Sequence, residues 1–331
     1  MLNYQKYKRV PVMTYPEREW PNKEIEKAPI WCSVDLRDGN QALIDPMVVG
    51  EKIEFFQYLV NMGFKEIEVG FPAASQIEYD FLRQLIDRRL IPDDVRVQVL
   101  TQCREELIDR TFEAIEGCKQ AIVHIYNSTS TLQRDVVFNM DRDQITEIAV
   151  KGTQMVKERA AKFGGKIILE YSPESFTGTE MDFAVEICNA VIDIWQPTPE
   201  DKVIINLPAT VEMSMPHVYA QQIEYMHKHL HDRENVIISI HPHNDRGCAV
   251  ADSEMGKEKL QAAGEKILAS FKEMGMEVGD TRYVNAYAQG RKDWNMLTFS
   301  EQNVDNNNET VAAKQLYRIA KTFLKGMRDF T

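Results

Sequence analysis

The chain has 331 residues, 44% of them hydrophobic, which is enough for one large core or two ordinary ones. Its net charge of −12 argues against nucleic acid or an anionic membrane as the main partner, because both bind basic surfaces. No stretch approaches the ~20 apolar residues of a membrane span, and no signal-peptide core opens the chain. Five scattered cysteines without a Cys-x-x-Cys pair are typical of reduced thiols. We therefore expect a soluble cytoplasmic protein.

Residues 1–30 have the composition of an extended arm. Four prolines exclude a long helix here: Pro11, Pro16, Pro21 and Pro29. The arm also carries apolar side chains, among them Tyr4, Tyr7 and Trp20, which form too much surface to leave in water. We expect this surface to pack on a second copy of the chain, giving a homodimer.

From residue 31 onward, apolar runs alternate with segments of helical periodicity. The predicted strands cover residues 31–36, 66–70, 95–100, 121–126, 166–171, 202–207 and 236–240. The predicted helices cover residues 45–62, 77–89, 104–117, 141–163, 180–195 and 216–230. Short loops and an even composition favour one (β/α)8 TIM barrel over residues 31–331. A doubly wound open sheet is the alternative, but no Gly-x-Gly-x-x-Gly follows the first strand.

Two strand ends carry residues that suit a metal ion. The first predicted strand brings Arg37 and Asp38 to its tip, and Gly39-Asn40 then turns the chain. The strand 236–240 runs into His241 and His243, whose spacing of two places both rings on one side. Alone, such an aspartate is usually a turn or cap residue, and such a histidine pair is more often structural. Together they predict a divalent metal site.

Other polar residues fall at the same ends of the middle strands. Glu170, Ser172 and Glu174 are spaced by two and share one face, although Pro173 places Glu174 already in the loop. His124 lies at a similar depth on the preceding strand, and Thr210 follows strand six. Glu170 could pair with a cation and His124 could be a core histidine. Convergence on one rim favours a site instead.

Five motifs together resemble the α-isopropylmalate synthases. They are Asp35–Leu43, Glu66–Pro72, Tyr171–Ser175, Asn206–Glu212 and His241–Gly247. The resemblance extends from the N-terminal arm to about residue 254. It implies a Claisen condensation of acetyl-CoA with 3-methyl-2-oxobutanoate to 2-isopropylmalate, in leucine biosynthesis.

The resemblance also implies roles for single residues. Asp38, His241 and His243 match the ligands of a divalent ion such as Mg²⁺, Mn²⁺ or Zn²⁺. Arg37 matches the catalytic residue that faces the reacting carbonyl oxygen. The positions that line the 2-oxo acid are matched by His124, Ser172, Glu174 and Thr210.

The chain departs from this family in two places. Between residues 256 and 283 it lacks the family's Gly-Asn-Gly-Glu-Arg-Thr-Gly-Asn loop, and strand eight falls at either 266–271 or 282–287. After a predicted helix over 309–327 it ends at Thr331, without the subdomain that supplies a catalytic histidine or the leucine-binding regulatory domain. We therefore expect slower turnover, with Glu174 as the remaining candidate base. Alternatives are a citramalate or homocitrate type synthase, a lyase, or a metal-binding barrel without turnover.

Overall fold

The computed structural model describes residues 29–258. Seven strands form one parallel sheet in chain order: β1 Cys32–Ser33, β2 Glu66–Gly70, β3 Arg96–Gln102, β4 Gln120–Ser128, β5 Lys166–Glu174, β6 Val203–Ala209 and β7 Val236–Pro242. The helices are α1 Val49–Met62, α2 Gln76–Asp87, α3 Glu105–Ile115, α4 Arg142–Ala160, α5 Met181–Trp195, α6 Pro216–His229 and α7 Ala249–Glu258. No helix in this part of the chain could span a membrane. Residues 1–28, both positions for strand eight and the helix expected at 309–327 lie outside the described residues.

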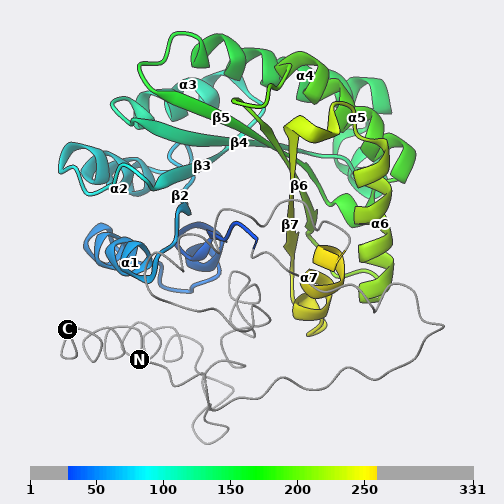
Figure 1. The fold of residues 1–331 in the computed structure, drawn as a ribbon, viewed down its shortest axis with the longest axis horizontal. Helices are drawn as coiled ribbons and strands as arrows, with labels where there is room; N and C mark the ends of the chain where they lie inside the picture. The colour runs from blue at the N-terminus through cyan, green and yellow to red at the C-terminus, as the bar shows by residue number, and fades with distance from the viewer. Residues whose placement is uncertain (1–28, 259–331) are drawn as a thin grey trace, which may run out of the picture.

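The sheet is curved, and helices α1 to α6 cover its outer face (Figure 1). Every residue of β2 and β6 is buried, as expected for parallel strands covered on both faces. Helix side chains such as Phe56, Phe81 and Phe183 pack in the large core that also contains the outward side chains of the strands. The helices therefore pack against the sheet through apolar side chains that recur at helical spacing.

The inner face of the sheet is built in two layers. Ile122, Ile168 and Ile204, from β4, β5 and β6, form a small apolar cluster. Two residues further along each strand, on the same face, stand His124, Glu170 and Asn206 (all buried). An apolar floor thus lies beneath a polar layer, which places the polar side chains toward the carboxyl ends of the strands.

The two edges of the sheet approach each other. Strands β1 and β7 are first and last in the strand order, yet Asp38, just beyond β1, contacts His241 on β7. A flat seven-stranded sheet could not make this contact, because neighbouring strands are about 4.8 Å apart. The described part of the chain is therefore a parallel α/β sheet that curves as barrel strands do.

Several predicted boundaries differ from the observed ones, and three of these differences have a clear local cause. The first strand ends at Ser33, not at residue 36, because the Ser33 hydroxyl donates to the Asp35 carboxylate (2.6 Å) and the chain coils into the π-helical turn Asp35–Gly39. Helix α1 begins at Val49 rather than 45, where Glu51 caps the Val48 N–H. The third error is at Glu174.

Strand β5 extends to Glu174, which the sequence placed in a loop. Proline interrupts strands because it lacks an N–H. Here β5 pairs with β6 only at Glu170 and Tyr171, so Pro173 leaves no bond to β6 unmade. Pairing with β4 continues to the last residues of both strands, where Ser128 stands opposite Glu174.

Candidate active site

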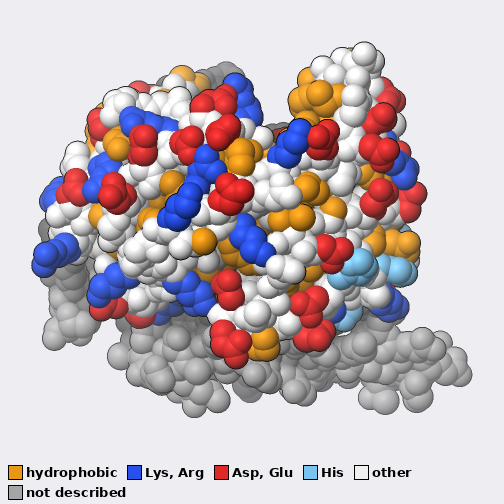
Figure 2. Space-filling model, turned by 90° about the horizontal axis from the view of Figure 1, so that it is seen from above, with side chains coloured by type: hydrophobic (Ala, Val, Ile, Leu, Met, Phe, Trp, Pro, Cys, Tyr) orange, Lys and Arg blue, Asp and Glu red, His pale blue; other side chains and the backbone are white. Residues whose placement is uncertain are grey.

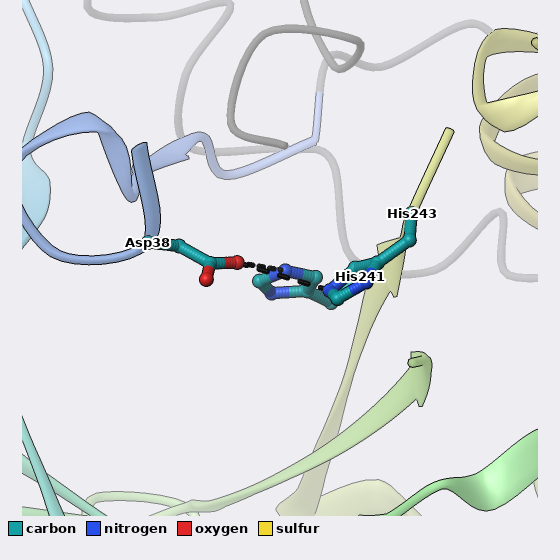
Figure 3. Close-up of side chains that lie close together, drawn as sticks. All are labelled: Asp38, His241 and His243. Atoms are coloured by element: carbon teal, nitrogen blue, oxygen red, sulfur yellow. Dashed lines mark hydrogen bonds and ion pairs between the residues drawn. The ribbon is translucent and has the colours of Figure 1, made fainter. Parts of the chain in front are cut away.

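Asp38, His241 and His243 lie close together (Figure 3). The Asp38 Oδ2 lies 3.2 Å from His241 Nε2 and 3.8 Å from His243 Nε2. One ligand atom from each of the three residues lies within 4.8 Å of the others. The carboxylate comes from the turn Asp35–Gly39, whereas His241 belongs to β7 and His243 follows it. The site therefore joins the two edges of the sheet.

Local structure and charge make the two imidazoles suitable ligands. The His243 N–H donates to the Ala209 carbonyl (3.2 Å), so the chain stays beside β6 after β7 ends. Burial lowers the pKa of both histidines, well below the ordinary value for His241, where His243 and Arg37 add to the effect. Both rings are then neutral near pH 7, and a neutral imidazole has one nitrogen lone pair that can bind a cation. The donor set fits a divalent ion.

Arg37 is held beside this group by a buried carboxylate. Its Nε donates to Glu68 Oε2 (2.6 Å), and its Nη1 lies 3.0 Å from Asp38 Oδ1. Although burial opposes both charges, the pKa of Glu68 is strongly lowered, chiefly by Arg37 and then by His124. Glu68 and Asp38 raise the pKa of Arg37 against the opposing effect of burial. The guanidinium is therefore a permanent positive charge in a set orientation.

His124 extends the network to β5 and β6. Its Nδ1 lies 2.9 Å from Glu68 Oε1, and its Nε2 lies 2.7 Å from the Ser172 hydroxyl. Asn206 donates to that hydroxyl as well (2.8 Å). Burial raises the pKa of Glu170, 3.5 Å from His124 Nδ1, to about 7. His124 and Ser172, predicted separately, thus belong to one buried hydrogen-bonded network with Arg37.

Glu174 and Thr210 form a second group at the same end of the sheet. The Ser128 hydroxyl donates to Glu174 Oε2 (2.6 Å). The Thr210 hydroxyl, just after β6, accepts the N–H of Ser175 (2.9 Å). Ser128 and Glu174 are the last residues of β4 and β5, and Thr210 directly follows β6, so this group lies at the carboxyl ends of the parallel strands. All eight predicted site residues therefore stand at one end of the sheet.

Three residues of the network were missed by sequence reasoning: Glu68, Gln98 and Asn206. Glu68 offered a signal, because it lies between Ile67 and Val69 in a strand predicted to be covered on both faces. A carboxylate at such a position needs a charged partner. Gln98, which donates to Glu68 (3.2 Å), offered none.

A family model described as HMGL-like matches residues 28–280. The chain belongs to the HMGL-like family. Every residue of the candidate site lies inside the matched span of this HMGL-like chain. Among curated relatives, it is 59% identical over 295 residues to a 2-isopropylmalate synthase of Helicobacter hepaticus, covering 87% of this chain and 52% of that protein. A 2-isopropylmalate synthase of Desulfitobacterium hafniense is 56% identical over 296 residues, which cover 88% of this chain and 53% of that protein. The chain thus spans about half the length of the curated relatives it matches.

Solved structures agree on the fold. The hydroxymethylglutaryl-CoA lyase of Pseudomonas aeruginosa superposes with a TM-score of 0.54 at 15% identity, over 89% of this HMGL-like chain and 98% of that one. The HMG-CoA lyase of Brucella melitensis superposes with a TM-score of 0.54 at 16% identity, over 76% of this chain and 93% of that one. At such low identity the likeness shows a shared fold alone.

Proposed function

We propose that this chain catalyses the condensation of acetyl-CoA with 3-methyl-2-oxobutanoate to 2-isopropylmalate, as an acyltransferase of leucine biosynthesis. The observation that carries the proposal is the convergence of Asp38, His241 and His243 beside the oriented charge of Arg37. Curated relatives named 2-isopropylmalate synthase, at 54–59% identity, support this reaction. We place residues 31–331 in one (β/α)8 barrel preceded by the arm of residues 1–30.

Asp38, His241 and His243 would hold a divalent cation, Mg²⁺, Mn²⁺ or Zn²⁺, because one carboxylate oxygen and two neutral imidazoles suit all three. When bound, such a cation acts as a Lewis acid toward a chelating 2-oxo acid. Arg37 directs positive charge to the ketone oxygen, where negative charge develops, while Glu68 keeps the guanidinium oriented. His124, Ser172 and Thr210 line the 2-oxo acid, which places its ketone carbon toward the acetyl group.

Glu174 takes the proton from the methyl carbon of acetyl-CoA. That carbon then forms the new bond to the ketone carbon as the π bond of the ketone breaks, and the ketone oxygen takes the proton held by Glu174 to become a hydroxyl. Water cleaves the thioester, leaving the new carboxylate and free CoA thiol. A positioned general base contributes typically about 10²–10⁴-fold to such a proton transfer.

We further infer a cytoplasmic homodimer. All five cysteines are free, which suits a reducing compartment. Acidic and basic side chains are interspersed on the face drawn in Figure 2, and its described residues show no continuous basic stripe. The apolar arm of residues 1–30 supplies the dimer contact. Sedimentation at micromolar concentration should therefore give twice the 38.2 kDa chain mass, and a monomer would contradict the dimer.

Release of free thiol from acetyl-CoA tests the reaction directly. The full chain, loaded with Mg²⁺, Mn²⁺ or Zn²⁺ in turn, is assayed with 3-methyl-2-oxobutanoate, pyruvate and 2-oxoglutarate. Fastest release with 3-methyl-2-oxobutanoate is expected. Preference for pyruvate or 2-oxoglutarate would redirect the proposal to a citramalate or homocitrate type synthase. Release with none of the three would refute the synthase and leave a metal-binding barrel.

A further inference from the structure

The carboxylate of Glu174 is oriented by a hydroxyl from the neighbouring strand. Ser128 and Glu174 are the last residues of β4 and β5 and stand opposite each other in the parallel register. The Ser128 hydroxyl donates to Glu174 Oε2 over 2.6 Å, the short length of a hydrogen bond to a charged acceptor. Ser128 is only 8% exposed, so water competes poorly for this bond.

The backbone of Glu174 is hydrogen-bonded by Thr129, the residue after Ser128. The Thr129 N–H donates to the Glu174 carbonyl (3.1 Å), and the Thr129 hydroxyl lies 3.2 Å from the same oxygen. Thr129 is fully buried, and its hydroxyl also lies 2.7 Å from that of Thr179. The end of β4 therefore holds both the main chain and the side chain of Glu174.

The turn that follows is strained and held from its other side. Ser175 has φ of 61°, in the left-handed region that residues with a side chain rarely adopt. Its N–H donates to the Thr210 hydroxyl after β6 (2.9 Å). Strain of this kind persists only where surrounding contacts over-determine the backbone. Glu174 is thus placed by β4 on one side and β6 on the other.

We propose that Ser128 is a positioning residue that aims the carboxylate of Glu174 at the acetyl methyl group. This inference rests on the proposed function, in which Glu174 receives the methyl proton. The Ser128 hydroxyl donates to Oε2, and we assign Oε1 as the oxygen that takes the proton. Without the bond, the carboxylate rotates about its last torsion, which is broad and has no single preferred angle. Ser128 acts on the reaction only through Glu174.

The test compares Ser128→Ala with a matched variant, Ser130→Ala. Ser130 is also buried, in the same segment, but its hydroxyl donates to Gln133 (2.8 Å) and not to Glu174. In the full metal-loaded chain, Ser128→Ala should lower kcat for thiol release about 10- to 100-fold, the size of effect that misplacing a catalytic group produces. The KM for the 2-oxo acid should stay within about twofold, because substrate binding is not altered. Ser130→Ala should match the wild type, and Ser128→Thr should recover most of kcat.

Two further measurements separate this inference from the proposed function. If Ser128 acts through Glu174, then Ser128→Ala should change kcat little in a Glu174→Ala background. Additive losses in the double variant would overturn the positioning role, and so would an unchanged kcat in Ser128→Ala when Glu174→Ala is impaired. Wild-type rates in Glu174→Ala would instead refute the base assigned in the proposed function.

A structural readout makes the test independent of turnover. A crystal structure of Ser128→Ala should show the Glu174 carboxylate rotated or in several orientations, with β4 and β5 unchanged. Unchanged placement of that carboxylate would refute the inference even if the chain released no thiol. Thermal unfolding of each variant confirms that the fold is intact.

Discussion

Asp38 is the residue on which the metal proposal turns, because both histidines approach the same oxygen of its carboxylate. Asp38→Ala should reduce the affinity for Mn²⁺ or Zn²⁺ by about a hundredfold or more, since even residues that only support a ligand are worth 10–100-fold. Titration calorimetry measures this, and circular dichroism should show an unchanged fold. Asp80→Ala, which removes an exposed carboxylate on α2, is the control. Equal affinities of the two variants would refute the site.

Arg37 and Glu68 form a buried pair in which neither charge is stable alone. Glu68 has no exposed surface, and Arg37 is its closest charged partner (2.6 Å). Arg37→Met should lower the free energy of unfolding by about 3–5 kcal/mol, because it removes the guanidinium that pairs with the buried Glu68 carboxylate. Glu68→Gln in the same chain should restore much of the loss. Urea unfolding of the single and double variants checks this, and a double variant no more stable than Arg37→Met would contradict it.

At the scale of elements, α7 carries a buried carboxylate that makes stability depend on pH. Asp252 is 1% exposed and its Oδ1 has no hydrogen-bond partner. Burial, and then the charge of Glu212, raise its pKa from 3.8 to about 7. Between these values the folded chain keeps a proton that the unfolded chain has lost, so this contribution to stability falls as pH rises toward 7. Above pH 7 the folded chain carries a buried, charged Asp252 carboxylate, which lowers the free energy of unfolding.

Asp252→Asn mimics the protonated state and should remove this dependence. The gain in free energy of unfolding over the wild type should be small at pH 4.5 and reach about 2 kcal/mol at pH 8, after allowance for solvent screening. Urea unfolding across this range gives the difference. Asp80→Asn, on the exposed side of α2, serves as the control. A gain of the same size at every pH would mean that the carboxylate does not titrate as described.

Features of the helices and strands that depend on neighbouring residues in the chain could be predicted from the sequence, whereas contacts between strands could not. The end of α1 was predicted from Gly63, which adopts φ of 99° after the helix, and β2 was predicted with its observed bounds. These features depend on neighbours in the chain. The pair Arg37–Glu68 and the pair Ser128–Glu174 depend on the register between strands, and periodicity within one strand does not report register. The early end of β1 came from a side-chain bond between Ser33 and Asp35 that competes with the ladder.

Sequence pattern alone singled out the three residues that the structure brings together near one point. The spacing of two between His241 and His243 at a strand end indicates a ligand pair, and the position of Asp38 after an apolar run places it at another strand end. Their meeting required the sheet to curve until its edges approached, which alternating strands and helices already imply. Glu68 stands between Ile67 and Val69, a position where a charge needs a partner. A buried acid within a predicted strand is therefore a signal to search for its cation.

At the scale of the whole molecule, a bound cation would link the β1 edge of the described sheet to the β7 edge. Asp38 follows β1, whereas His241 lies on β7 and His243 just after it, so one ion would bridge segments more than two hundred residues apart in sequence. An ion that binds only the folded chain at about 100 times its Kd adds about 2.7 kcal/mol to stability. For a domain of this size we expect the Tm to rise by about 4 °C.

Thermal unfolding with EDTA and then with excess Zn²⁺ or Mn²⁺ measures this rise. The wild type should gain it and Asp38→Ala should not, because that variant keeps the fold but lacks the carboxylate that binds from the β1 side. Ser128→Ala should gain as much as the wild type, since its hydroxyl contacts Glu174 and no metal ligand. An equal rise in Asp38→Ala would place the stabilising cation elsewhere in the molecule, and the two edges of the sheet would then be joined by protein contacts alone.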